Sequence, residues 1–160
     1  MSNIGPCSYY LGIKIIRDRE KNTIYLSQQA YIQKLLNKLG FNNLNPTSTP
    51  MQENLELLLN PENQSLDNIY YYQTIIGSLL YLSLGTRMDI MLATTKLVKF
   101  ASNPSNNHLK ALKQVLRYLK GTKDYMLCYK QNIKPNNLRL IGYSDADWAG
   151  DKLSRKLTSS

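Results

Sequence analysis

The 160-residue chain has few cysteines, a single histidine and no long uninterrupted apolar run. Its two cysteines, Cys7 and Cys128, form no CxxC pair and have no histidine beside them, so neither a zinc motif nor a disulfide framework is supported. We expect two reduced thiols in an intracellular protein that is not secreted, with cytoplasm and nucleus both open. The N-terminus has no basic region ahead of an apolar stretch, which argues against a secretory signal. No run approaches the roughly 18–20 apolar residues that span a bilayer, so we expect a soluble protein with no membrane partner.

Acidic residues are scarce in one part of the chain. Residues 96–139 hold ten basic residues and one acid, Asp124; ten minus one is nine, which equals the formal net charge of +9. The rest of the chain holds ten residues of each sign and is neutral. A localised basic excess favours a phosphate-rich partner, but charge alone leaves a solvated basic surface as an equal alternative.

Apolar spacing and turn residues predict an α+β fold that starts with a β-hairpin. Ser27 and Asp89 are predicted to cap helices at their N-termini, and Gly40 and Gly121 to end them. Gly77 lies within an apolar helix, where it is expected to allow close packing of another element. The predicted elements are strands at 9–16 and 23–27, helices at 28–39, 70–86, 90–103 and 105–120, and strands at 125–130 and 138–144.

The predicted helix at 105–120 carries two parallel stripes. Leucines at 109, 112, 116 and 119 form an apolar stripe, and the basic side chains follow the same intervals one position later. Such a basic stripe can contact the phosphates of nucleic acid, and an aromatic ring beside it can add a stacking surface. An ordinary amphipathic helix with a basic outer face is the alternative. The candidate binding residues are Lys110, Lys113, Arg117, Lys120 and Tyr118.

The only histidine, His108, begins this helix. With no partner at ligand spacing, we expect it to be a surface residue of the first turn rather than a metal ligand or an acid–base group.

Three aspartates, Asp145, Asp147 and Asp151, lie close together in "LIGYSDADWAGDK". A calcium loop is disfavoured, because Lys156 takes the position where that loop needs a bidentate glutamate. Surface-turn chemistry is a second interpretation. The third is part of a divalent-metal site at the end of a strand, where Asp145 and Asp147 project to one face. One strand supplies only part of such a site.

The ordered segments "YYLGIKI", "LSQQAYIQKLL", "STPM", "YYQTIIGSLLYLSLGTRMDI", "HLKALKQVLRYLKGT" and "GYSDADWAGDKLSRKLTSS" resemble the copia-type LTR-retrotransposon Pol polyprotein over essentially the whole chain. The resemblance implies the C-terminal part of a reverse transcriptase running into the start of ribonuclease H. The implied segments are the end of the palm with a primer-gripping hairpin at 1–45, a linker at 46–69, a helical thumb- or connection-like region at 70–124, and a truncated ribonuclease H-like start at 125–160.

The resemblance also implies functional residues and partners. Asp145 resembles the first metal-binding aspartate of ribonuclease H. The resemblance assigns no ligand role to Asp147 and Asp151, which are secondary candidates for catalysis only. The intact parent would use Mg²⁺ or Mn²⁺, and neither is expected to bind this fragment tightly. The expected partners are an RNA–DNA hybrid or a DNA duplex, as template–primer, and the remaining parts of the polyprotein.

Departures from the family pattern affect the expected activity. Met88 stands where the family commonly has proline, and Leu157 and Ser160 stand where it has serine and glycine, which suits a decaying element copy. No YxDD polymerase motif occurs. We therefore expect a fragment that contacts template–primer but is catalytically incomplete by itself. The alternatives are a non-catalytic nucleic-acid-binding remnant and an unselected relic of a transposable element.

Overall fold

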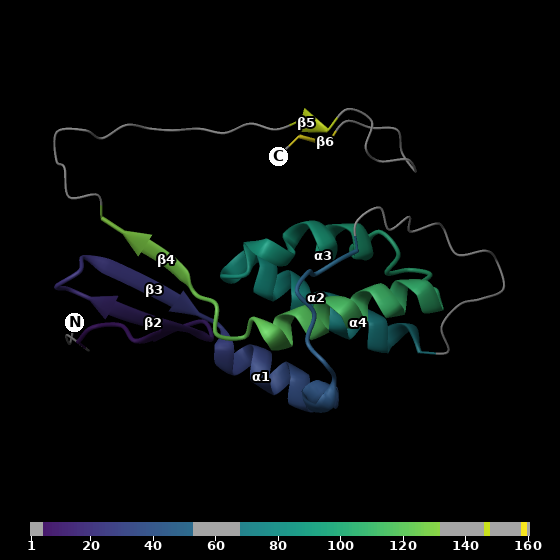
Figure 1. Ribbon diagram of the computed structural model, residues 1–160, viewed down its shortest axis with the longest axis horizontal. Coiled ribbons are helices and arrows are strands. Elements are labelled where there is room, and N and C mark those ends of the chain that lie inside the picture. The colour runs from purple at the N-terminus through teal and green to yellow at the C-terminus, as the bar shows by residue number, and fades with distance from the viewer. Residues whose placement is uncertain (1–4, 53–67, 132–145, 148–157, 160) are drawn as a thin grey trace. The chain divides into compact units, whose positions relative to one another are not determined.

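The computed structural model describes residues 5–52, 68–131, 146–147 and 158–159 (Figure 1). The chain divides into two units, Met1–Lys130 and Gln131–Ser160, which are considered separately. In the second unit, strand β5 (Ala146–Asp147) pairs antiparallel with β6 (Thr158–Ser159). The first unit is an α+β fold with one sheet and a helical cluster. No helix among the described residues is long and apolar enough to cross a membrane.

The sheet of the first unit has four antiparallel strands in the order β1-β2-β3-β4. The predicted hairpin is confirmed, because β2 and β3 pair from Lys14↔Ser27 to Asp18↔Thr23. The prediction of one continuous strand over 9–16 is wrong. Leu11 and Gly12 have φ angles of 47° and 79° and form a two-residue turn, which folds β1 back onto β2. The strands are β1 (Tyr9–Tyr10), β2 (Ile13–Asp18), β3 (Thr23–Ser27) and β4 (Leu127–Lys130).

Strand β4 lies far along the chain from its partner. Its register runs from Leu26↔Leu127 to Thr23↔Lys130, so the predicted strand at 125–130 joins the N-terminal hairpin. The strand predicted at 138–144 lies outside the described residues.

Helix α1 (Gln29–Lys38) follows β3 directly. Gly40 has a φ of 73° just after this helix, as predicted from its sequence position. Ser27 is not the N-cap, because it still belongs to β3 and Gln28 takes the capping position. The Ser27 hydroxyl nevertheless accepts the backbone N–H of Gln29 at 3.3 Å. The short 3-10 helix η1 (Phe41–Asn43) comes next.

Helix α2 (Ile69–Gly85) is capped by Asn68, whose side chain accepts the backbone N–H of Tyr71. The expectation that Gly77 permits close packing is wrong, since a Cβ at this position would meet no atom of another element within 4 Å among the residues that the structure describes. Helix α3 (Met91–Val98) follows η2 (Met88–Ile90), and Ile90 takes its N-cap position, so Asp89 is not its N-cap. Helix α4 (Asn106–Gly121) includes Gly121, and Thr122 is its C-cap.

The core of the first unit lies among the helices. Helix α2 packs against α3, and α4 contacts both α1 and α3. The side chains of Ile32, Tyr72, Leu79 and Leu116 are fully buried there. No residue of the sheet belongs to this core.

Candidate nucleic-acid interface

Helix α4 begins with a reciprocal cap. The Ser105 side chain accepts from the backbone of His108, and His108 Nδ1 accepts the Ser105 backbone N–H at 2.9 Å. The His108 ring stacks on Phe100, with ring centroids 3.9 Å apart. His108 is 1% exposed, so the expectation of a surface residue is wrong. It fixes the start of α4 by combining a polar cap with a packed ring.

The apolar stripe of α4 is buried as predicted. Leu112, Leu116 and Leu119 are fully buried, while Leu109 is half-buried beside the core. Val115 adds a fourth fully buried side chain. The stripe anchors the helix, and the adjoining basic stripe therefore runs along the edge of a rigid surface.

The four basic residues of the stripe divide into two pairs. Lys110 and Lys113 are exposed in the first half of α4, and no ion pair or hydrogen bond of their side chains occurs within the described part of the chain. Arg117 and Lys120 are half-buried and bind backbone carbonyls of η1 and of the two residues that follow it. Arg117 Nε donates to the carbonyl of Asn45 at 2.6 Å.

Lys120 completes this second pair. Its Nζ donates to the carbonyls of Asn42 and Leu44. The two cations at the C-terminal end of α4 thus donate hydrogen bonds to backbone carbonyls, and these bonds hold the segment 42–45 against the helix. Of the four basic residues of the stripe, Lys110 and Lys113 are therefore the exposed pair.

Tyr118 is not the stacking surface that its position suggested. Its ring is 8% exposed, and its hydroxyl donates to Asp89 Oδ2 at 2.8 Å. An aromatic ring must be open on one face to stack with a base. Tyr118 is therefore removed from the candidate interface and assigned to a buried polar network.

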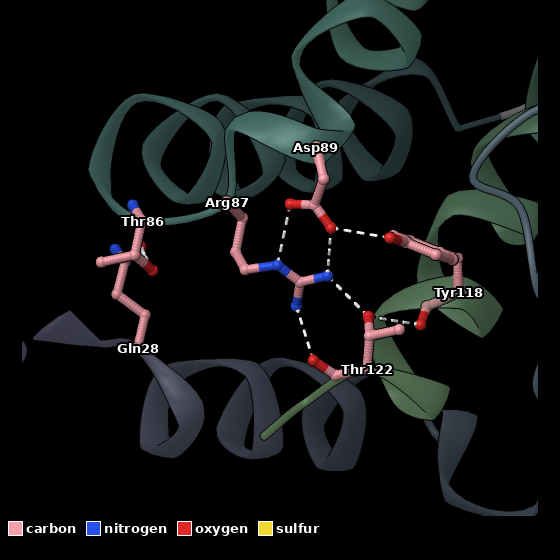
Figure 2. Close-up of polar contacts among 6 residues, drawn as sticks. All are labelled: Gln28, Thr86, Arg87, Asp89, Tyr118 and Thr122. Atoms are coloured by element: carbon pink, nitrogen blue, oxygen red, sulfur yellow. Dashed lines mark hydrogen bonds and ion pairs between the residues drawn. The ribbon is translucent and has the colours of Figure 1, made fainter. Parts of the chain in front are cut away.

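The centre of this network is Arg87, which is 1% exposed and lies between Asp89 and Thr122 (Figure 2). Its Nε and Nη2 donate to the two carboxylate oxygens of Asp89 at 3.0 and 2.7 Å. Its Nη1 and Nη2 donate to the carbonyl and hydroxyl oxygens of Thr122 at 3.0 and 2.5 Å. The Cζ atom of Arg87 also lies 5.7 Å from the ring centroids of both Tyr118 and Tyr125. These contacts join η2 to the end of α4.

The network lowers the pKa of the Asp89 carboxyl. Burial alone would raise this pKa, but hydrogen bonds from Arg87 and Tyr118 and the charge of Arg87 outweigh that effect. The pKa of Tyr118 is raised, first by burial and then by its hydrogen bond to Asp89. Asp89 is therefore a charged structural partner of Arg87 at neutral pH.

A neighbouring contact fixes the end of α2 against α1. The Gln28 side-chain carbonyl accepts both the backbone N–H and the hydroxyl of Thr86, at 3.0 and 2.9 Å (Figure 2). Gly85 lies close to the same amide, since a Cβ on Gly85 would be 2.6 Å from Gln28 Oε1. Sequence reasoning missed Gln28, Arg87 and Asp89 as a set. The available signal was an arginine two residues before an aspartate, within "TRMDI" at the end of an apolar helix.

The three candidate catalytic aspartates are less fully described. Asp145 and Asp151 lie outside the described residues, and Asp147 pairs with Thr158 in the β5–β6 ladder. Among the described residues, no group of three or more histidine, cysteine, aspartate or glutamate residues could hold a metal ion. The metal-binding role of Asp145 stays a prediction.

Comparison with known proteins identifies relatives of the chain. It is 36% identical over 162 residues to the retrovirus-related Pol polyprotein of transposon TNT 1-94 from Nicotiana tabacum, which covers 98% of this chain and 12% of the polyprotein. It is 42% identical over 144 residues to the corresponding polyprotein of transposon RE1 from Arabidopsis thaliana, which covers 90% of this chain and 9% of the polyprotein. Its homologues are retrovirus-related Pol polyproteins.

The match to these Pol homologues supports the resemblance to a copia-type polyprotein. The chain spans about a tenth of their length. A shorter relative, an uncharacterized mitochondrial protein of Arabidopsis thaliana, is 34% identical over 164 residues, with 99% of this chain and 63% of that protein covered. No protein-family model matches the chain, and no solved structure is significantly similar to it.

Proposed function

We propose that the chain is a segment of the reverse transcriptase and ribonuclease H region of a copia-type Pol polyprotein, and that it contacts the backbone of template–primer nucleic acid through Lys110 and Lys113. The observation that carries this proposal is the exposed cation pair on α4, a helix fixed by a buried apolar stripe. Homology to Pol polyproteins of transposons supports the choice of nucleic acid as the partner.

The division of the basic stripe into an exposed pair and a half-buried pair sets the expected salt dependence of binding. Each phosphate contact made by a cation contributes about 0.9 to the slope of log affinity against log salt on duplex DNA. Four free cations would contribute about 3.6 to that slope, whereas the two exposed lysines contribute about 1.8. Arg117 and Lys120 contribute less, because their donors already bind carbonyls of the segment 42–45.

The proposal is tested by the binding of a labelled RNA–DNA hybrid to the chain across a salt series. The Lys110→Ala/Lys113→Ala variant is expected to lose about two units of slope and to bind more weakly at every salt concentration. Lys34→Ala/Lys38→Ala is the matched control, because it removes the same charge from exposed positions on α1. Equal losses in both variants, or no binding by the wild type, would contradict the proposal.

We also propose that Asp145 belongs to the ribonuclease H site of the intact polyprotein, with Asp147 and Asp151 as secondary candidates. Carboxylates of this kind suit Mg²⁺ or Mn²⁺, which would supply Lewis-acid activation of a phosphoryl group when bound. The 160-residue chain is expected to show neither DNA synthesis on a primed RNA template nor cleavage of a hybrid with Mg²⁺ present. Either activity in the purified chain would refute this part of the proposal.

The non-catalytic remnant stays the alternative function. It makes the same use of Lys110 and Lys113 but needs no flanking polypeptide. The helices bury an apolar core, and Arg87 is hydrogen-bonded to both Asp89 and Thr122. These contacts support a chain that folds and disfavour a relic without stable structure.

A further inference from the structure

The sheet of the first unit has one strongly apolar face. Residues paired directly across antiparallel strands point to the same side, so the register of β2, β3 and β4 defines two rows on this face. One row is Ile15, Leu26 and Leu127, and the other is Arg17, Ile24 and Tyr129. We call these six residues the sheet face. The opposite side carries mostly polar residues, among them Lys14, Asp18 and Lys130.

None of the six residues of the sheet face is buried. Ile24 is 36% exposed, Tyr129 is 54% exposed, and the Ile15–Leu26–Leu127 row is only half-buried. No sheet residue belongs to the core or to the half-buried apolar residues packed on it. An antiparallel sheet normally packs one face on a core, and exposed apolar patches of this kind mark interaction sites. Within the described part of the first unit, the sheet face has no covering layer.

We propose that the sheet face is an intramolecular docking surface for the polypeptide that adjoins this region in Pol-type polyproteins. The partner is an apolar layer with a carboxylate opposite Arg17, the one charge on the face. The region that matches this chain is 12% of one such polyprotein and 9% of another. Most of the polypeptide that could supply this layer therefore lies in the parts of those polyproteins that flank the matched region. A second copy of the chain is disfavoured, because two molecules of charge +9 repel each other and would bring unpaired arginines into an apolar contact. This inference is independent of nucleic-acid binding.

The test uses single-cysteine proteins and the rate of thiol labelling by a maleimide. Ile24→Cys, in a Cys7→Ser/Cys128→Ser background, reports on the sheet face. The control is Cys128 in a separate Cys7→Ser protein, because Cys128 is exposed and pairs with Tyr25, which lies next to Ile24 in the strand and hence on the opposite side of the sheet. Tyr129→Cys in the Cys7→Ser/Cys128→Ser background is a second reporter in case Ile24→Cys disturbs folding.

Each reporter is measured in the full chain alone and in two fusions. One fusion carries the polypeptide that precedes the matching region in the TNT 1-94 polyprotein, and the other carries the polypeptide that follows it. In the chain alone, both reporters and Cys128 should label rapidly. In one fusion the reporters should slow by about tenfold or more, since tethering gives millimolar effective concentrations. Cys128 should keep its rate.

Three results would overturn the proposal. Rapid labelling of both reporters in both fusions would show that neither flank covers the sheet face. Slow labelling in the dilute chain alone would mean that residues of this chain already cover it. Labelling that slows only as the chain is concentrated would identify a second copy as the occupant.

Discussion

Replacement of Arg87 by methionine tests whether the buried network stabilises the fold. Met has a similar unbranched stem but no donors, so Arg87→Met removes four hydrogen bonds and leaves their acceptors in place. The two Thr122 acceptors keep other contacts, because the carbonyl still accepts from Tyr125 and the hydroxyl still donates to the Tyr118 carbonyl. We therefore take the low end of the cost of an unpaired buried group, about 1 kcal/mol for each acceptor.

The Asp89 carboxylate adds a smaller loss. Its side chain is 33% exposed and can rehydrate, so the lost ion pair counts as about 1 kcal/mol, near a surface pair. Weak contacts of the guanidinium with the Tyr118 and Tyr125 rings add up to about 1 kcal/mol. Together these terms predict a loss of about 3–4 kcal/mol in the free energy of unfolding.

Urea unfolding followed by circular dichroism measures this loss. With an m-value of about 2 kcal/mol/M, the midpoint of Arg87→Met should fall by about 1.5–2 M. Lys21→Met is the control, because it breaks an exposed 3.5 Å ion pair with Asp18 and should leave the midpoint almost unchanged. Arg87→Lys keeps the positive charge but loses the planar guanidinium with its paired donors, so its urea midpoint should lie between those of the wild type and Arg87→Met. Equal midpoints for Arg87→Met and Lys21→Met would refute a buried Arg87.

Two further predictions concern Asp89 and His108, which make polar contacts at opposite ends of α4. Because the pKa of Asp89 is lowered in the folded state, the stabilisation that its charge provides is complete above the unfolded-state pKa of about 3.9 and is lost as the pH falls through the folded-state pKa. Asp89→Asn should therefore lower the free energy of unfolding at neutral pH and lose less further stability in acid than the wild type. Urea unfolding at several pH values measures both effects. His108→Ala should lower the stability measured by thermal unfolding by about 2 kcal/mol, since it removes the acceptor that caps α4 and the stack on Phe100. His108→Gln should be more stable than His108→Ala, because glutamine supplies an acceptor for the Ser105 N–H. Equal stability of the Ala and Gln variants would contradict the capping role.

Local patterns in the sequence predicted much of the first unit. Turn residues and alternation identified the β2–β3 hairpin, and the leucine spacing identified α4 together with its buried side. Gly40 marked the end of α1. These features depend on residues within one or two turns of each other, so a single stretch of sequence contains the signal.

Contacts between distant segments were not predictable in the same way. Arg117 lies on the basic stripe by periodicity, but its partner Asn45 is 72 residues away and accepts through a backbone carbonyl that any residue has. Tyr118 lies next to the stripe for the same reason, yet Asp89, 29 residues away, holds it inside. Periodicity shows which side of a helix is apolar, and it does not show which polar groups at the boundary find buried partners.

Protection of individual lysines by an RNA–DNA hybrid tests the central claim most directly. The chain is acetylated with a lysine-reactive reagent, with and without the hybrid, and the extent at each lysine is read by mass spectrometry. Lys110 and Lys113 should be protected by the hybrid, Lys120 should react slowly in both conditions because two carbonyls hold its Nζ, and Lys34 should be unchanged. Equal labelling of Lys110 and Lys113 with and without the hybrid, under conditions where it binds, would show that the exposed half of the α4 stripe is not the nucleic-acid interface.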